Sequence, residues 1–530
     1  MKLASFDIFD TSLIRKAFSP KSVFQILGEE LFGIESEKAR DFIRWRIDVE
    51  NIMWKTNPHY SIFDIYDELP QEVSAPFTPQ EIMLREMQVE SDMLVANVEV
   101  RNTINTYRAQ GYQIAFISDM YLPLSFLKNI LRREACMEES DFVFVSCEEK
   151  ARKSTGELFR KIKKNLNPEK WIHYGDNVQS DFKIPKAYGI KSFLVHTEKQ
   201  GVECIELDSR ISALLRTCRL QLGNTALSRL SVHYVATLYV PYVKWVIENA
   251  LRKGFQRLYF LSRDAFILQR IAETLPHGKI ELRYLFASRK SLSDENQSKN
   301  VRKYLQQEGL CDNIFSAIVD VGWLGTTRRM MNEILEEQGA NKVFFFYFNS
   351  WKEALPKTYG DYASFIPEPI QNKEITSFIE DFCSVCPYPT TVGYSISEEK
   401  KWEPVFPKGQ KYHETAILKS NIDACLKYAE LVDDFKISLK EMKETMNASI
   451  KHLFSFDDYV DFSPLEFLPG CDGRLAAKKL SLPEIFRITF GGIVTLNDRV
   501  SLEITGGLRL TKIVWIFHNF FYIVISKFNK

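Results

Sequence analysis

The chain has 530 residues, which is too long for a single hydrophobic core and predicts about two to four domains. Lysine plus arginine and aspartate plus glutamate number 69 each, so the net charge is zero and no global basic field indicates a nucleic-acid partner. Nine irregularly spaced cysteines argue against a disulfide scaffold, and the acidic start MKLASFDIFD does not resemble a signal peptide. We therefore expect a cytoplasmic protein.

The first part of the chain, to about residue 205, alternates strand-like and helix-like segments. An apolar run over residues 3–9 precedes a mainly helical stretch from about 16 to 100, where apolar residues recur at three-and-four spacing. Four further strand-like runs follow, at residues 114–118, 142–146, 171–175 and 192–196. This alternation predicts parallel strands with crossover helices, and ligands of such sheets sit at the carboxyl ends of the strands.

A second α/β region begins near residue 220. It opens with a long amphipathic helix over residues 231–254, which a glycine ends. Strand candidates follow at residues 257–264, 282–289, 316–323 and 342–350. We place the end of this domain near residue 385 and expect a mostly helical, mixed region over 386–507. The predicted class is thus α/β, with a Rossmann-like N-terminal domain and a second α/β domain.

Side chains with oxygen donors recur at three predicted strand ends of the N-terminal domain. They are Asp7 and Asp10, then Ser118, then Asp176 and Asp181, with Lys153 just ahead of a predicted helix. A carboxylate nucleophile needs a cation to neutralise an incoming phosphate, and a lysine to hold the charge of the transferring group. We expect Asp7 and Asp176 to bind Mg²⁺, Asp181 to be a further ligand or its support, and Ser118 to donate to a phosphoryl oxygen.

In this order, the residues resemble the four motifs of the haloacid dehalogenase (HAD) superfamily. The matching stretches are Asp7-Ile8-Phe9-Asp10-Thr11, Ser118 in AFISDMYLP, Lys153 in RKSTGELF, and Asp176 and Asp181 in YGDNVQSD. The resemblance covers residues 1–205, under half of the chain. It implies a Rossmann-like core with a helical cap, which the run 16–100 matches. It also implies a Mg²⁺-dependent hydrolase, chiefly a phosphatase, that works through an aspartyl-phosphate on Asp7.

One position departs from the phosphatase pattern. Phosphatases of this superfamily carry a second aspartate two residues after the nucleophile, which protonates the leaving group and then activates water. Here that residue is Phe9, and we expect the neighbouring Asp10 to accept hydrogen bonds from backbone donors of the turn. Three interpretations stay open: a phosphatase with an unusual acid, a hydrolase or transferase with another leaving group, and a degenerate domain that binds phosphorylated ligands without turnover.

A glycine-rich turn opens a predicted helix in the second region. VDVGWLGTT, residues 319–327, runs from a strand through Gly322 and Gly325 into Thr326. Free N–H groups at a helix start favour an anion, so this turn is either a phosphate- or nucleotide-sugar-binding loop or simply a tight strand–helix connection. The charged pair Arg263–Asp264 also lies at a predicted strand end, which strengthens the hypothesis of a site.

The last 23 residues, 508–530, are strongly aromatic and flanked by lysines. Their apolar run of about 13 residues is shorter than the ~20 that a membrane span needs. We expect either a peripheral membrane anchor or a helix packed on the protein or on a partner.

The whole chain is also similar to HAD hydrolases with an added C-terminal domain that are linked to bacterial surface-polysaccharide synthesis. Two hypotheses follow from this resemblance. The first is a phosphatase acting on a small phosphorylated metabolite such as a sugar phosphate. The alternative is a degenerate module that binds phosphosugars or nucleotide sugars within a polysaccharide-synthesis assembly.

Overall fold

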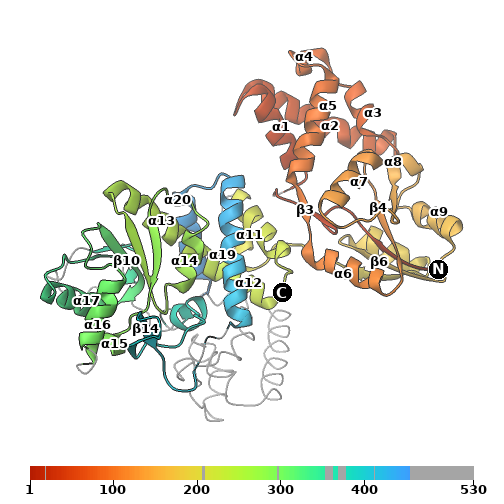
Figure 1. Cartoon of the computed structure of the whole chain (residues 1–530). Coiled ribbons are helices and arrows are strands. Elements are labelled where there is room, and N and C mark those ends of the chain that lie inside the picture. The colour runs from red at the N-terminus through yellow and green to blue at the C-terminus, as the bar shows by residue number, and fades with distance from the viewer. Residues whose placement is uncertain are drawn as a thin grey trace, which may run out of the picture. The chain divides into compact units, whose positions relative to one another are not determined.

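The computed structural model describes residues 1–453, apart from 18, 206–208, 295–297, 352–361, 368–369, 371–375, 377, 411 and 413. The aromatic segment 508–530 and the end of the mixed region 386–507 lie outside the described residues. The contacts between Cα atoms divide the chain into two compact units, residues 1–225 and 226–530 (Figure 1). None of the helices in the described part is both long and apolar enough to cross a membrane.

The first unit is built on a five-stranded parallel sheet. In spatial order its strands are β5 (Phe142–Val145), β4 (Gln113–Ser118), β1 (Lys2–Phe6), β6 (Lys170–Gly175) and β7 (Lys191–Leu194). The chain leaves β1 for β4 and β5 on one side and returns to β6 and β7 on the other. Strand β1 is therefore the central strand at which the order reverses. The predicted α/β class is confirmed, and the five strands lie where the hydrophobic pattern places them.

Helices cover both faces of this sheet. Alternate residues of β4 point to opposite faces, so Phe116 shares one hydrophobic cluster with Leu127 of α7 (Leu124–Arg133), while Ile117 shares another with Phe159 of α9 (Glu157–Leu166). The remaining elements of the unit that follow β3 are α6 (Val98–Ala109), α8 (Ser146–Glu149), a π-helical turn (Val178–Lys183), α10 (Ile184–Ala187), a 3₁₀ turn (Gly201–Cys204) and α11 (Ser209–Gln221).

A helical insert lies between β1 and β4, as the sequence predicts for residues 16–100. It contains α1 (Ser22–Phe32), α2 (Glu37–Thr56), α3 (Ile62–Asp67), α4 (Gln71–Ser74) and α5 (Pro79–Met93). The buried Arg46 of α2 donates through Nε and Nη2 to the two carboxylate oxygens of Glu86 on α5, both at 2.7 Å. The chain enters and leaves the insert through an antiparallel ribbon of β2 (Leu13–Arg15) and β3 (Leu94–Ala96).

The second unit contains another five-stranded parallel sheet. Its spatial order is β12 (Tyr362–Ser364), β11 (Phe344–Ser350), β10 (Ser316–Trp323), β8 (Arg257–Leu261) and β9 (Glu281–Leu285). Its other described elements include α13 (Thr237–Lys253), α14 (Phe266–Ala272), α15 (Arg289–Ser293), α16 (Ser298–Gln307), α17 (Thr326–Glu337), a π-helical turn (Ile379–Cys383), the ribbon β13 (Gly393–Ile396) and β14 (Trp402–Val405), α19 (Ala416–Asp434) and α20 (Leu439–Leu453).

The two faces of this second sheet have different partners. Tyr242 and Trp245 of α13 pack on aromatic rings of β11 such as Phe348 and Phe346. On the other face, Ile318 and Tyr347 belong to a hydrophobic cluster that contains residues of α16 and α17. The predicted helix 231–254 begins as a π-helical turn over Ser231–Ala236, continues as α13 and ends at Gly254, whose φ of +77° suits glycine.

Candidate active site

Three residues expected at strand ends lie side by side at the carboxyl edge of the first sheet. Asp7 follows β1 directly, Ser118 is the last residue of β4, and Asp176 follows β6 directly. These strands are parallel neighbours, with Phe6 opposite both Phe116 and Tyr174, so their ends meet at one edge. Asp7 and Ser118 are buried, whereas Asp176 is partly exposed. A site can therefore be approached from the side of Asp176.

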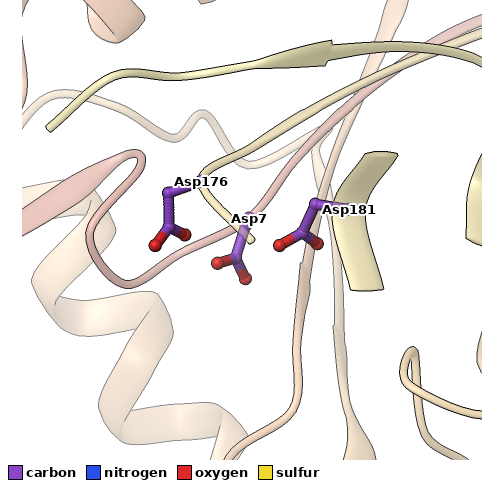
Figure 2. A group of neighbouring side chains, drawn as sticks. All are labelled: Asp7, Asp176 and Asp181. Carbon is purple, nitrogen blue, oxygen red and sulfur yellow. The ribbon is translucent and has the colours of Figure 1, made fainter. Parts of the chain in front are cut away.

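The three predicted metal-ligating aspartates are brought together. One carboxylate oxygen each from Asp7, Asp176 and Asp181 lies within 4.8 Å of the others, and Figure 2 shows the three carboxylates gathered at one place. Asp181 comes from the π-helical turn Val178–Lys183 after β6; the side chain of Asn177, which precedes this turn, accepts from the backbone N–H groups of Gln179 and Ser180. This cap fixes the turn that carries Asp181.

Lys153 joins the nucleophile candidate to the buried aspartate. Its Nζ donates to Oδ1 of Asp7 and to Oδ1 of Asp181, both at 2.6 Å. Burial opposes its charge, but the carboxylates of Asp7 and Asp181 outweigh burial and raise the pKa of Lys153. Its backbone N–H donates to Asp119 at 2.7 Å, and the next N–H, of Ser154, donates to the other oxygen of Asp119 at 3.1 Å. Lys153 is thus a fixed cation on a fixed loop.

The acidic groups differ in their electrostatics. Burial, together with the charges of Asp181 and Asp176, raises the pKa of Asp7 well above its usual value although Lys153 opposes the shift. Burial and the neighbouring Asp10 and Asp181 raise the pKa of Asp176 to about 6. Burial also acts on Asp181, but Lys153 and His173 outweigh it and lower the pKa of Asp181.

These residues fit a divalent cation. Three carboxylates and one ammonium leave a net charge of two negatives when all are ionised, and this negative charge favours a bound cation. Carboxylate oxygens are the donors that Mg²⁺ prefers. Asp7 and Asp176 would hold the ion, whereas Asp181 fits the supporting role better, because its oxygens already contact Lys153, His173 and the N–H of Asn177.

A buried layer behind the site orients Asp181. Nε2 of His173 lies 3.1 Å from Oδ1 of Asp181, and Nδ1 lies 2.8 Å from Oγ of Ser5, which also accepts from the indole of Trp171. Burial lowers the pKa of His173, so the ring is neutral at neutral pH. His173 therefore positions Asp181 and does not itself face the carboxyl edge.

The position of the usual general acid holds no proton donor. Phe9 is buried, and the guanidinium carbon of Arg15 lies 4.4 Å from the centre of its ring. The expectation for Asp10 was wrong in its partners: its carboxylate pairs with Arg15 at 3.5 Å and with Arg216 at 2.9 Å, not with the backbone of the turn. Arg216 comes from α11, far along the chain, so the turn alone could not reveal it.

A cavity of about 360 Å³ opens beside Asp176. Its walls are polar and carry both signs of charge; they include Asp10, Arg15, Ser19, Thr197, Lys199 and Arg216. Sequence reasoning assigned no role to Arg15, Thr197 or Arg216, because none of them belongs to a motif. Asp119 was also left without a role, although its place next to Ser118 at a strand end was a usable signal.

In the second unit the predicted phosphate-binding turn connects β10 to α17. A side chain at Gly322 would place its Cβ 2.0 Å from the carbonyl oxygen of Asn349, so the close approach of β10 and β11 alone requires glycine there. Gly325, with a φ of +65°, precedes α17, and Thr326 is the first residue of that helix. Phosphate binding by Gly322, Gly325 and Thr326 stays a prediction.

No family model and no curated protein matches the chain. Among solved structures, a Bacillus subtilis protein described as the HAD-hydrolase YfnB, bound to magnesium, aligns at 12% identity and TM-score 0.28, over 38% of this chain and 90% of its own. A Thermotoga maritima protein described as a β-phosphoglucomutase aligns at 17% identity and TM-score 0.28, over 40% and 91%. One from Lactobacillus delbrueckii subsp. bulgaricus, described as a phosphoglycolate phosphatase, aligns at 14% identity and TM-score 0.23, over 36% and 84%.

Proposed function

We propose that the first unit is a Mg²⁺-dependent phosphohydrolase of the HAD type, acting on a small phosphorylated metabolite such as a sugar phosphate. The observation that carries the proposal is the double contact of Lys153 with Asp7 and Asp181, beside Asp176. A nucleophilic carboxylate, a fixed cation and a partly exposed acid at one strand edge are the groups that phosphoryl transfer through a carboxylate requires. The helical insert would serve as the cap.

Each residue has a distinct task in this proposal. An oxygen of Asp7 attacks phosphorus, the bond to the leaving oxygen breaks, and that oxygen departs with the electron pair. Lys153 and the hydroxyl of Ser118 hold the phosphoryl oxygens while the charge moves. Bound Mg²⁺ supplies further neutralisation of the phosphate charge. Water then attacks the aspartyl-phosphate, releasing phosphate and restoring the carboxylate of Asp7.

The buried Phe9 restricts the leaving group. Phe9 itself offers no proton to the leaving oxygen, and Arg15 above its ring is held in its charged form by Glu90 and Asp10. A general acid typically contributes ~10²–10⁴-fold in rate. Substrates whose leaving group departs as a stable anion, such as acyl and aryl phosphates, should therefore react faster than alkyl phosphates.

The cavity beside Asp176 suits a small polar substrate. Its volume of about 360 Å³ falls within the range of small-molecule sites, ~300–1,000 Å³. Hydroxyl, carboxylate and guanidinium groups in its walls can hydrogen-bond a polar metabolite. Thr197 and Arg216 are already ordered there, since Nε of Arg216 donates to the carbonyl of Thr197 at 2.6 Å.

The test is Mg²⁺-dependent release of phosphate from aryl, acyl and sugar phosphates by the full chain. We expect turnover in the wild type, none in Asp7→Asn, and unchanged turnover in Asp41→Asn, a matched control at a half-exposed surface site. Turnover that survives Asp7→Asn would show that Asp7 is not the nucleophile. Absence of turnover with every substrate would contradict the proposed function.

A second function is favoured by Phe9 alone: a non-catalytic module that binds phosphosugars or nucleotide sugars in a polysaccharide-synthesis assembly. Here we expect a sugar phosphate to bind the wild type and Asp7→Asn equally, without phosphate release. Docking through residues 508–530 belongs to this hypothesis. Recovery of the full chain and of a chain lacking 508–530 in equal amounts after flotation with lipid vesicles would contradict docking to a membrane.

A further inference from the structure

The second unit also gathers charged side chains at the carboxyl edge of its sheet. The chain leaves β8 for β9 on one side and returns to β10 on the other, so the strand order reverses between β8 and β10. Ligands of open parallel sheets bind at this kind of point. Asp320 lies one residue beyond the strand pair Phe260–Val319, and Asp264 follows the end of β8 by three residues. The topology therefore places both carboxyl groups at the reversal point.

Asp264 and Asp320 are partly exposed as residues, but their carboxyl groups are largely shielded from water and interact with each other. Burial, with the charge of Asp264 added, raises the pKa of Asp320 to about 8. Burial raises the pKa of Asp264 to about 6, with Arg263 and Arg289 opposing the shift. At neutral pH Asp320 is thus largely protonated, which allows its carboxyl group both to donate and to accept hydrogen bonds.

An independent observation concerns Tyr347 on β11. Tyr347 is the register partner of Asp320, so both side chains leave the sheet on the same face. Burial, followed by the charge of Asp320, raises the pKa of the Tyr347 hydroxyl. Its side chain is 1% exposed, and the hydroxyl has no hydrogen-bond partner among the described residues. The buried indole N–H of Trp323, at the end of β10, also has no hydrogen-bond partner among the described residues. A buried polar group without a partner is unfavourable, and a bound ligand that hydrogen-bonds it removes this cost.

Aromatic rings border this edge on the side of β9. Tyr284 interacts with the charge of Asp264, and its ring meets Phe266 and Phe286 edge-on, at centroid distances of 5.7 and 5.0 Å. Tyr284 and its neighbour Tyr388 are partly exposed. Tyr284 pairs in register with Phe260, and Phe260 with Val319, so the Tyr284 side chain lies on the face opposite to Asp320 and Tyr347, on the side of Asp264. Carboxyl and phenol groups that can hydrogen-bond suit a ligand that presents several hydroxyls.

Two other ligand classes fit these groups less well. Among the described residues, the cluster of Asp7, Asp176 and Asp181 is the one place where three metal-ligating groups lie within 4.8 Å, so Asp264 and Asp320 do not form a prearranged metal site. Inorganic phosphate would meet the charge of Asp264, whose carboxyl group is mostly ionised at neutral pH. A ligand without charge at this point avoids that repulsion.

We propose that the carboxyl edge of the second unit binds a polyhydroxylated ligand, a polyol or glycosyl ring, through Asp264, Asp320 and Tyr347. Asp264 and Asp320 hydrogen-bond neighbouring hydroxyls, and Tyr347 pairs with a third. This site is separate from Asp7 and Lys153, and the proposal does not depend on the phosphatase activity.

The test is saturation-transfer NMR on the full chain with glucose, galactose, N-acetylglucosamine and glycerol as probes. We expect transfer to at least one probe in the wild type, with unchanged signal in Asp7→Asn and in Asp312→Asn, a control acid at the opposite, amino-terminal side of β10. Asp320→Leu should weaken binding at least 10-fold. Asp320→Asn, which keeps the shape and hydrogen-bonding atoms, should retain most of it and thereby separates ligand contact from folding.

Three outcomes would overturn the proposal. One is the absence of transfer to every probe at millimolar concentration. Another is transfer that persists in Asp320→Leu and in Asp264→Leu. The third is that the wild type binds Mn²⁺ or inorganic phosphate but none of the sugars, and that Asp320→Leu abolishes this binding. That result would assign the edge to a cation or an anion.

Discussion

The guanidinium group of Arg15 lies 4.4 Å above the ring of Phe9, which stands where the HAD phosphatases that the first motif resembles carry a second aspartate. Arg15 is kept there by Glu90, which accepts from its Nε at 2.9 Å. Because the buried pair with Glu90 holds Arg15 in its charged form, Arg15 cannot take over the transfer of a proton. This arrangement gives the first prediction.

Replacing Phe9 with aspartate should widen the range of leaving groups. An aspartate there can protonate a departing alkoxide, so we expect kcat/KM for alkyl phosphates to rise at least ~10-fold while aryl phosphates change little. The measurement is a plot of kcat/KM against the pKa of the leaving group, for wild type and Phe9→Asp. Phe9→Leu serves as the control, and equal slopes for Phe9→Asp and wild type would contradict the role given to this position.

The aspartyl-phosphate of the wild type should persist long enough to detect. Phe9 cannot activate the attacking water, so its attack is slower than in an enzyme with an acid there. Intact-mass measurement after rapid acid quench should show one added phosphoryl group with acetyl phosphate as substrate, and none in Asp7→Asn. If no phosphoryl group accumulates and product forms without a burst, then breakdown of the intermediate is not the slow step.

Removing the charge of Lys153 should harm both stability and activity. In Lys153→Met the buried carboxylates of Asp7 and Asp181 lose their shared cation, which costs ~3–5 kcal/mol of unfolding free energy for a broken buried pair. Lys161→Met is the matched control, because Lys161 pairs with Glu149 near the surface. Chemical denaturation compares the variants, and a Lys153→Met protein as stable as Lys161→Met would show that the pairing contributes little.

Mg²⁺ should stabilise the folded protein through the three aspartates. A ligand at 100 times its Kd adds ~2.7 kcal/mol, so removal of the metal with a chelator should lower the melting temperature of the wild type. The same treatment should leave Asp176→Asn unchanged. Differential scanning calorimetry with and without chelator decides this, and an equal decrease in both proteins would place the metal elsewhere.

The stability of the second unit should fall as the pH rises, because of Asp320. Its folded pKa of about 8 lies above the ordinary value of 3.8, so the folded state holds the proton more tightly and stability decreases between about pH 4 and pH 8. Asp320→Asn removes this titration, and we expect it to be more stable than the wild type at pH 8 by ~2 kcal/mol or more, but not at pH 4. Denaturation at the two pH values measures this, with Asp312→Asn as the control. A wild type and Asp320→Asn with the same pH dependence would contradict the burial of a charge at this position.

The strand-end residues could be predicted from the sequence, while their partners could not. The positions of Asp7, Ser118 and Asp176 are predictable because the end of each apolar run marks the end of a strand, and the ends of parallel strands lie at one edge of the sheet. Lys153 stood out ahead of a predicted helix, but no local pattern fixes that its side chain reaches both Asp7 and Asp181. Arg216 reaches Asp10 from 206 positions away, and only the packing of α11 creates that contact.

The second sheet shows the same limit in another form. Asp264 stood out at a strand end, but the interaction of Asp320 with Tyr347 depends on the register of β10 and β11. A shift of one residue would turn Tyr347 to the opposite face. Hydrophobic pattern predicts that both strands exist and does not fix their register. The three-residue strands β2 and β3 escaped prediction because a period-two signal needs more residues than they contain.

Beside the ribbon of β2 and β3, hydrogen bonds connect the helical insert to the backbone of Asp7. Oγ of Ser12 donates to the carbonyl oxygen of Asp7 at 2.6 Å, and the carbonyl of Ser12 accepts from the backbone N–H of Asn97 at 3.0 Å. The two chain segments that enter and leave the insert thus meet at Ser12, which is itself hydrogen-bonded to Asp7. A displacement of the insert relative to the sheet would therefore be transmitted through Ser12 to the backbone of Asp7.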